Sequence, residues 1–236
     1  MVTERDADVG LTTRPFPIVL SAPSGAGKTS VAREIFQRLP YLRFAVSLTT
    51  RKRRQGEVDG KDYRFVAEQE FERAREAGEL AEWAVVHGNR YGTPRAEIER
   101  ALEEGSHVLI DVDVQGGEVL MKAYPDAVSI FLLPPSHAAM EARLRGRGTD
   151  SAVAIEARLQ EAMKELESVE HYEYVIVNRE LEKTVEVFAH IIHAEEHRRS
   201  RKVNLDGWLD VHFPERRREE RPAGRAKAPS SSGAPA

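Results

Sequence analysis

The stretch "SAPSGAGKTS", Ser21–Ser30, decides the fold of this chain. It follows the apolar run "PFPIVL" and leads into a stretch with helical periodicity from 28 to 39. A strand, a glycine-rich turn and a helix in that order are typical of a loop that cradles phosphate groups, because backbone N–H groups at a helix N-terminus bind anionic oxygens. The alternative is an ordinary strand-to-helix turn with a surface lysine.

The residue types inside this loop favour phosphate binding. Gly25 and Gly27 allow the backbone to approach the phosphates closely. Lys28 is expected to reach the β- and γ-phosphates, and Thr29 to place its hydroxyl on Mg²⁺. Ala22 stands where the usual pattern has glycine, which is compatible with the motif if its φ is negative. The loop alone indicates an NTPase or a kinase and no more.

Length and composition exclude several classes of protein. A chain of 236 residues can bury a large core, and the absence of cysteine excludes disulfides and thiolate metal sites, which fits a reducing, cytoplasmic location. The first apolar run is too short for a signal peptide or a membrane span. A net charge of -4 lacks the basic footprint of a nucleic-acid-binding domain. We expect no membrane and no nucleic-acid partner, with monomer and homo-oligomer both open.

Strand and helix patterns alternate along the chain. The β-rich runs at 17–22, 107–114, 127–133 and 172–178 are separated by helical stretches such as 28–39, 96–104 and 151–169. This alternation predicts an α/β fold with a parallel sheet flanked by helices. Two insertions, at 47–93 and around 143–158, are expected to form lobes on this core. The polar ends of the chain are predicted to be disordered tails.

The first insertion contains candidate anion and purine ligands. "SLTTRKRRQGEVDGKDYRF", 47–65, clusters Arg51, Arg53 and Arg54, which suits a dianionic phosphate, although a solvated charge run is the alternative. "GELAEWAVVHGNRYGTP", 78–94, offers Glu82 and Thr93 at the two ends of a strand. A carboxylate can accept from guanine N1–H and N2–H₂, and hydroxyls can satisfy O6. The alternatives are a surface carboxylate and, for the tyrosine of this segment, a packing ring.

A further motif, "VLIDVDVQG" at 108–116, closes a buried strand with two carboxylates. Asp111 and Asp113 are alternate residues, so we expect both on the same side of the strand at the edge where ligands of open parallel sheets gather. Asp111 is predicted to hold Mg²⁺ or its waters, and Asp113 to face a base. The alternative is that both cap the following helix.

Together, "SAPSGAGKTS", "SLTTRKRRQGEVDGKDYRF", "AEWAVVHGNRYGT", "IDVDVQG", "RLRGRGTD" and "YVIVN" resemble the guanylate kinase family over about 16–197. The resemblance implies a P-loop NTPase-type sheet with a GMP-binding insertion lobe and a lid. It implies transfer of the γ-phosphoryl group of ATP to GMP, giving ADP and GDP, in GMP recycling and guanine nucleotide synthesis. The implied domain is 15–214, with its core at 15–46, 94–142 and 159–200, its GMP-binding lobe at 47–93 and its lid at 143–158, between tails at 1–14 and 215–236.

The resemblance also implies roles for individual residues. Four side chains, here called the guanine set, match those that recognise the base: Ser47, Glu82, Thr93 and Asp113. Five others, here called the phosphate clamp, match those on the GMP phosphate: Arg51, Arg54, Glu57, Tyr63 and Tyr91. Glu57 is expected to orient the clamp from behind, and Arg53 to be solvated.

The expected ATP site is the loop with one residue from the last strand: Ser21, Ala22, Pro23, Ser24, Gly25, Ala26, Gly27, Lys28, Thr29, Ser30 and Asn178. Catalysis is assigned to Lys28, Asp111 and three lid arginines, Arg143, Arg147 and Arg158, with Mg²⁺ on Thr29 and Asp111. Arg143 and Arg147 are expected to share a helix face, and Arg145 to point to solvent. An ordinary basic helix is the alternative.

Two rival functions are open at this stage. Peptide-binding scaffold domains with a guanylate-kinase-like fold lose the loop lysine or shorten the loop, whereas Lys28 and Thr29 are present here. A relative that phosphorylates a sugar phosphate would have no use for the paired carboxylates Glu82 and Asp113. Both comparisons favour a guanylate kinase.

Overall fold

The computed structural model describes residues 10–54, 56–146 and 152–217. The chain divides into two compact units, residues 14–201 and a smaller unit formed from the residues before 14 and after 201. The larger unit ends before the predicted domain boundary at 214, and it contains all the predicted site residues that the structure describes. In the described ranges, no helix is both long and apolar enough to cross a membrane.

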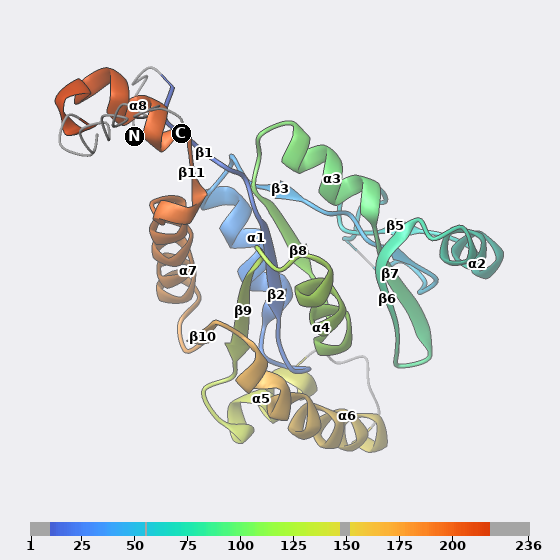
Figure 1. The fold of residues 1–236 in the computed structure, drawn as a ribbon. Coiled ribbons are helices and arrows are strands. Elements are labelled where there is room, and N and C mark those ends of the chain that lie inside the picture. Colours follow the sequence, from blue (N-terminus) through green and yellow to red (C-terminus); the bar gives the residue numbers. More distant parts are fainter. Residues whose placement is uncertain (1–9, 55, 147–151, 218–236) are drawn as a thin grey trace, which may run out of the picture. The chain divides into compact units, whose positions relative to one another are not determined.

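The centre of the larger unit is a five-stranded sheet in the order β10-β9-β2-β8-β3, parallel throughout (Figure 1). This confirms the predicted parallel sheet of an α/β fold. The strands are β2 Pro17–Ser21, β3 Arg43–Phe44, β8 Val108–Asp111, β9 Val128–Leu133 and β10 Tyr174–Val177. The helices that flank them are α1 Lys28–Arg38, α3 Arg95–Glu103, α4 Val114–Ala123 and α7 Leu181–Glu196, the last followed by η2 Arg199–Arg201.

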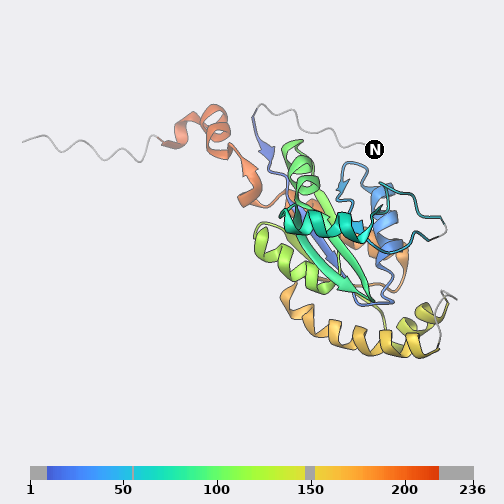
Figure 2. The ribbon, with the colours of Figure 1, turned by 90° about the vertical axis from the view of Figure 1, so that its right-hand side faces the viewer.

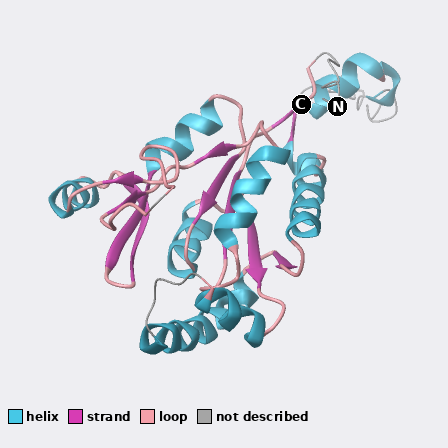
Figure 3. Cartoon of the chain, turned by 180° about the vertical axis from the view of Figure 1, so that it is seen from behind, coloured by secondary structure: helices cyan, strands magenta, loops and turns pink. Residues whose placement is uncertain are grey.

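Alternation along β2 builds a core on each face of the sheet. Ile18 and Leu20 belong to the cluster that includes buried residues of α1 and α7. Val19, which points to the opposite face, belongs to the cluster with buried residues of α3 and α4. All five residues of β2 are buried, as expected for a central parallel strand. Figures 1 and 3 show helices on both sides of the sheet. The phosphate loop therefore starts from a rigid strand.

The insertion predicted at 47–93 forms a four-stranded sheet in the order β5-β4-β7-β6. Its elements are β4 Leu48–Thr49, β5 Arg64–Phe65, α2 Glu68–Glu76, β6 Leu80–Val86 and β7 Asn89–Pro94. β6 and β7 form an antiparallel hairpin, and β4 joins it antiparallel to β7 and parallel to β5. A small apolar cluster of Leu48, Phe71, Ala74 and Leu80 lies beneath this sheet. The lobe thus has a core of its own.

Two helices follow β9 at the carboxyl edge of the main sheet: α5 His137–Arg145 and α6 Ala152–Glu165. The helix predicted at 151–169 is shorter than expected, because the chain tightens into a 3₁₀ helix, η1 Leu166–His171, after Glu165. Buried residues of α5 and α6 form a cluster of their own, Met140, Leu144, Ile155, Leu159 and Ala162. The two helices therefore pack as a pair.

The smaller unit consists of β1 Thr12–Thr13, β11 Lys202–Val203, α8 Leu205–His212 and η3 Pro214–Arg217. Thr12 and Thr13, predicted to lie in an N-terminal tail, pair antiparallel with Val203 and Lys202. The hydroxyl of Thr13 also accepts a hydrogen bond from Lys202 Nζ at 3.0 Å. The rest of the predicted tails, residues 1–9 and 218–236, lies outside the described residues.

Candidate active site

The phosphate loop leaves β2 and turns directly into α1. Gly25 and Gly27 have φ values of +85° and +92°, a left-handed backbone that glycine adopts without a steric penalty. Gly27 is the N-cap of α1, so the first N–H groups of the helix point into the loop. Among the described residues other than glycine, only His87 and Asn204 have positive φ. Ala22 is therefore compatible with the motif, as predicted.

Two side chains hold the loop from behind through the carbonyl of Ala26. Arg143 Nη1 and Asn178 Nδ2 both donate to this oxygen, at 2.8 Å and 2.7 Å. Arg143 Nη2 donates to the carbonyl of Asn178 at 2.8 Å, and the hydroxyl of Thr184 donates to Asn178 Oδ1 at 3.1 Å. A Cβ on Gly27 would lie 2.7 Å from Asn178 Nδ2, so the loop is closely packed here. The contact of Asn178 with adenine stays a prediction.

Lys28 lies against the end of β8. Its ammonium forms an ion pair with Asp111 Oδ1 at 2.7 Å and contacts the carbonyl of Val112. The Asp111 side chain is 9% exposed, so this ion pair is largely shielded from solvent. The lysine and carboxylate predicted for catalysis therefore lie together at the carboxyl edge of the sheet, and Thr29, the residue after the lysine, is exposed.

The prediction that Asp111 and Asp113 are alternate residues of one strand is wrong. β8 ends at Asp111, and Asp113 is the N-cap of α4, where its side chain accepts from Gly116 N–H at 2.8 Å. A short polar side chain before a helix competes for the first free N–H groups, and this local bond ends the strand early. The helix-capping alternative thus describes Asp113, whereas Asp111 pairs with the loop lysine.

Three members of the guanine set form a buried hydrogen-bonded chain. Ser47 Oγ lies 3.0 Å from Thr93 Oγ1, which donates to Glu82 Oε1 at 2.5 Å. All three residues are at most 5% exposed. The alternative of a surface carboxylate is therefore wrong for Glu82. The hydrogen bonds within this chain offset part of the free-energy cost of burying its polar groups, and they hold the three side chains in a fixed arrangement.

The fourth member, Asp113, lies across Gly116 from Glu82. A Cβ on Gly116 would lie 2.6 Å from Glu82 Oε2 and 3.3 Å from Asp113 Oδ1, so the two carboxyl groups converge on this glycine. Burial, with the nearby negative charge of Asp113, raises the pKa of Glu82 from its ordinary value to about 7. The main core and the insertion lobe thus each supply one acid to the same place.

The phosphate clamp is also assembled. Arg51 makes a bidentate ion pair with Glu57, at 2.8 Å and 3.0 Å, and its Nε donates to the hydroxyl of Tyr91 at 3.1 Å. The rings of Tyr63 and Tyr91 meet edge to face at 5.8 Å. Glu57 Oε2 accepts from Arg54 N–H at 2.8 Å, while the Arg54 residue is exposed. Glu57 therefore orients two arginines at once.

These contacts shift the pKa values of the Arg51–Glu57 pair in opposite directions. Burial alone would raise the pKa of Glu57, but the hydrogen bonds from Arg51 and from Arg54 N–H, with the charge of Arg51, outweigh burial and lower it. Burial alone would lower the pKa of Arg51, but its bonds to Glu57 and Tyr91 outweigh burial and raise it. Both groups are charged near neutral pH. The alternative of a solvated charge run does not describe Arg51, whose side chain is 10% exposed.

The remaining lid residues are only partly placed. Arg158 is half-buried on α6, and Arg145 makes an exposed i,i+4 pair with Glu141, as a solvated residue should. Arg147 lies outside the described residues, so its predicted face shared with Arg143 is not described, and α5 itself ends at Arg145.

Sequence reasoning missed Glu165. Its Oε2 accepts from the Ser24 N–H of the phosphate loop at 2.9 Å. Burial raises the pKa of this carboxyl group above its ordinary value. The only signal in the sequence is its spacing of seven residues from Arg158, two helical turns on the same side of a helix.

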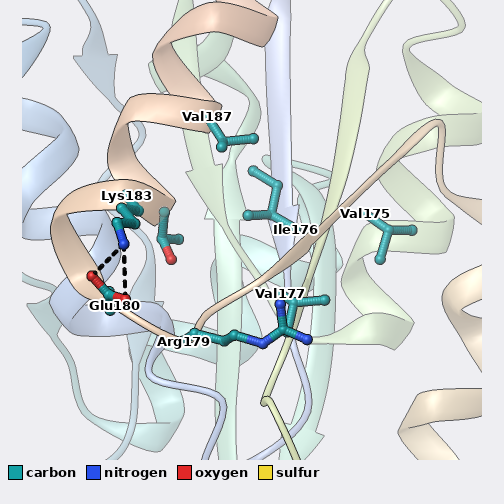
Figure 4. A pocket seen from close by; sticks show the side chains of 8 residues that line it. Val175, Ile176, Val177, Arg179, Glu180, Lys183 and Val187 are labelled. Carbon is teal, nitrogen blue, oxygen red and sulfur yellow. Dashed lines mark hydrogen bonds and ion pairs between the residues drawn. The ribbon is translucent and has the colours of Figure 1, made fainter.

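A pocket of about 350 Å³ lies elsewhere, between the edge strand β10 and the start of α7 (Figure 4). It is lined by Val175, Ile176, Val177, Arg179, Glu180, Lys183, Thr184 and Val187. Lys183 and Glu180 form an ion pair at 3.0 Å at its rim. The pocket contains none of the predicted site residues.

Comparison with known proteins agrees with this geometry. A family model described as guanylate kinase matches residues 14–195. The chain belongs to the guanylate kinase family. The guanylate kinase of Syntrophotalea carbinolica is 50% identical over 183 residues, which cover 78% of this chain and 87% of that protein. The guanylate kinase of Novosphingobium aromaticivorans is 47% identical over 204 residues, covering 86% and 92%.

A solved structure shows the same fold. The crystal structure of guanylate kinase from Anaplasma phagocytophilum matches with a TM-score of 0.74 at 36% identity, covering 86% of this chain and 98% of that one. This chain phosphorylates GMP to GDP with ATP as the phosphoryl donor, as a P-loop transferase of purine metabolism. The predicted family, fold and reaction are thus confirmed, and the scaffold and sugar-phosphate alternatives are set aside.

Proposed function

We propose that the guanine set recognises the base of GMP, and the buried Ser47–Thr93–Glu82 chain is the observation that carries this assignment. The two carboxylates suit the N1–H and N2–H₂ donors of guanine, and the two hydroxyls suit O6. Adenine has an unprotonated N1, which would face a buried acceptor. Unpaired buried acceptors are costly, so discrimination against AMP should be strong.

The phosphate clamp is the proposed site of the GMP phosphate. Glu57, Tyr91 and the Lys52 carbonyl accept from four of the five N–H groups of Arg51, which holds its guanidinium in place and leaves one Nη2 N–H for an anion. Arg54 is exposed and supplies a mobile second guanidinium. The lobe therefore fixes the acceptor by its base at one end and by its phosphate at the other.

Phosphoryl transfer then requires alignment and neutralisation of charge. An oxygen of the GMP phosphate attacks the γ-phosphorus of ATP and forms the new P–O bond. The bond from the γ-phosphorus to the bridging oxygen breaks, and ADP leaves. Lys28 accompanies the transferring group, and Arg158 and Arg147 are the proposed partners of its equatorial oxygens. No side chain has to act as a strong base, because the attacking oxygen already carries negative charge.

We also propose that Thr29 and Asp111 hold Mg²⁺. The hydroxyl and carboxylate are hard oxygen donors, and Asp111 lies at the carboxyl end of β8, where it pairs with the lysine of the phosphate loop. In the described part of the chain there is no group of three or more His, Cys, Asp or Glu that could hold an ion. That fits an ion held by few protein ligands and by the phosphates of the substrate. Bound there, Mg²⁺ would supply charge neutralisation on those phosphates.

A coupled assay of ADP formation with GMP, AMP, CMP and UMP tests these roles. Glu82→Ala should erode the preference for GMP over AMP, while the same change at the exposed Glu103 at the end of α3 should leave the preference unchanged. Asp111→Asn should raise the Mg²⁺ concentration needed for half-maximal rate. A Glu82→Ala enzyme that still rejects AMP as strongly as the wild type would remove Glu82 from the guanine set.

A further inference from the structure

Helix α6 carries a stripe of charged residues beside its apolar face. Its buried residues Ile155, Leu159 and Ala162 pack with α5. Arg158, Glu161 and Glu165 are spaced three and four residues apart, so they fall on one adjoining strip of the helix surface. Both acids in the strip contact other parts of the site, and neither contact is explained by the roles assigned so far.

The first contact ties α6 to the ATP site. Glu165, the last residue of α6, accepts the Ser24 N–H at the apex of the phosphate loop at 2.9 Å. A carboxylate beside a loop that binds phosphates is electrostatically unfavourable for the ligand, so this acid has a cost. The bond also fixes the one end of α6 that is nearest to the loop. A hydrogen bond to a charged acceptor is among the stronger ones in proteins.

The second contact ties α6 to the GMP-binding lobe. His87 Nδ1 lies 3.1 Å from Glu161 Oε2, with side chains 31% and 44% exposed. His87 and Gly88 form the two-residue turn of the β6–β7 hairpin, with φ values of +50° and +76°. Asn-Gly is the favoured pair for such a turn, and histidine is one of the few other residue types that adopt a positive φ with some frequency. Figure 2 shows the tip of the hairpin reaching toward α6.

We propose that α6 is a brace between the two substrate sites, in which Glu165 and Glu161 are positioning residues. Glu165 seats the helix on the phosphate loop, and Glu161 docks the hairpin of the GMP-binding lobe one helical turn away. Two anchors about 6 Å apart along one helix fix both its position and its rotation about its axis. Because Arg158 lies on the same strip, the two anchors also fix where Arg158 lies relative to the ATP and GMP sites. This inference rests on the proposed function, since it assumes that Arg158 acts on the transferring group.

A double-mutant cycle tests the hairpin anchor. His87→Asn removes the ring but suits the left-handed turn, and Glu161→Gln removes the charge. Each single change should raise KM for GMP by about two- to fivefold, the range of a partly exposed side-chain contact, with KM for ATP unchanged. The double variant should be no worse than either single one. Effects that multiply, or singles that match the wild type, would overturn this half of the brace.

The loop anchor is tested at Glu165 with a conservative partner. Glu165→Ala should raise KM for ATP and lower kcat, together about tenfold or more in kcat/KM, since a charged hydrogen-bond acceptor is lost. Glu165→Gln keeps an oxygen that can accept the Ser24 N–H and should restore most of the rate. Glu156→Gln, at an exposed position of the same helix, is the matched control and should behave as the wild type.

The outcomes separate the two levels of the proposal. Wild-type protein that fails to transfer phosphate to GMP would refute the proposed function itself. An active wild type with a folded Glu165→Ala variant of normal KM and kcat would overturn the brace alone. A Gln variant as impaired as the Ala variant would also overturn it, because the amide oxygen then does not replace the carboxylate.

Discussion

The efficiency with which the enzyme uses GMP should fall as pH drops through about 7, because Glu82 then becomes protonated. Its pKa is raised to about 7 by burial and by Asp113. A protonated Glu82 would present an O–H donor to the N–H donors of guanine, and that contact is unfavourable. Only the fraction of free enzyme with an ionised Glu82 is therefore competent to bind GMP.

The expected size follows from this fraction. With a pKa of about 7, about nine-tenths of Glu82 is ionised at pH 8 and about one-tenth at pH 6, so kcat/KM for GMP should fall about tenfold between them. The dependence of kcat/KM on pH reports groups of the free enzyme, which is where Glu82 has this pKa. The phosphate of GMP also titrates, near pH 6, but its contribution over this range is smaller.

The assay is ADP formation at fixed ionic strength from pH 5.5 to 8.5, with GMP varied at saturating ATP. The matched control is the pH dependence of kcat/KM for ATP at saturating GMP. Bound GMP already keeps Glu82 ionised under these conditions, so the fall in kcat/KM near pH 7 should disappear. In Glu82→Gln only the phosphate step should remain. A wild-type profile flat from pH 6 to 8, or one that Glu82→Gln retains, would refute the reasoning.

Three further changes have defined outcomes. Gly27→Ala should lower the free energy of unfolding by about 1–3 kcal/mol and weaken ATP binding, because φ is +92° and the new Cβ would lie too close to Asn178. Melting curves recorded with and without ATP measure both effects. Arg51→Lys should raise KM for GMP about tenfold and leave KM for ATP unchanged, because lysine cannot make the bidentate pair with Glu57. Arg145→Ala should stay within about 0.5 kcal/mol of wild-type stability and keep wild-type kinetics; a large loss in either would show that its exposed pairing is not its whole role.

The pH that weakens GMP binding should favour the folded state. The pKa of Glu82 is higher in the folded protein than its ordinary value, so the folded state binds more protons between about 4.5 and 7. The contribution of Glu82 to stability is fully present below that range and is lost as pH rises through 7. Glu82 is thus a residue that costs stability at the pH where it serves recognition.

Much of the site could be predicted because its chemistry is local in sequence. The phosphate loop needs its glycines, Lys28 and Thr29 within ten residues, and the phosphate clamp draws on a segment of thirteen residues plus Tyr91. Each motif combines several residue types at a short spacing, and the combination favours one use over the alternatives that each residue has alone. The parallel sheet is equally local in its signals, because buried strands read as short apolar runs between helices.

What could not be predicted lies in contacts between distant elements. Nothing in the spacing of Glu165 and Ser24, 141 residues apart, indicates that they meet. The early end of β8 was missed for a different reason, since a capping bond from Asp113 to Gly116 competes with a strand pattern that looked continuous. Such choices depend on small differences between local alternatives that are settled only by the packed structure.

Arg143, one of the predicted lid arginines, is already bonded to the backbone around the phosphate loop. At least two of the five N–H groups of Arg143 are bonded to the carbonyls of Ala26 and Asn178, at 2.8 Å each. These two hydrogen bonds fix the backbone conformation of the phosphate loop, and they also hold the positive charge of the guanidinium close to the loop. Arg158 lies on α6, and under the proposed brace its position depends on the contacts that Glu161 and Glu165 of that helix make with the β6–β7 hairpin and the phosphate loop. We therefore expect Arg143→Lys to impair ATP binding although it keeps the charge, because lysine lacks the planar fork that bridges the two backbone oxygens.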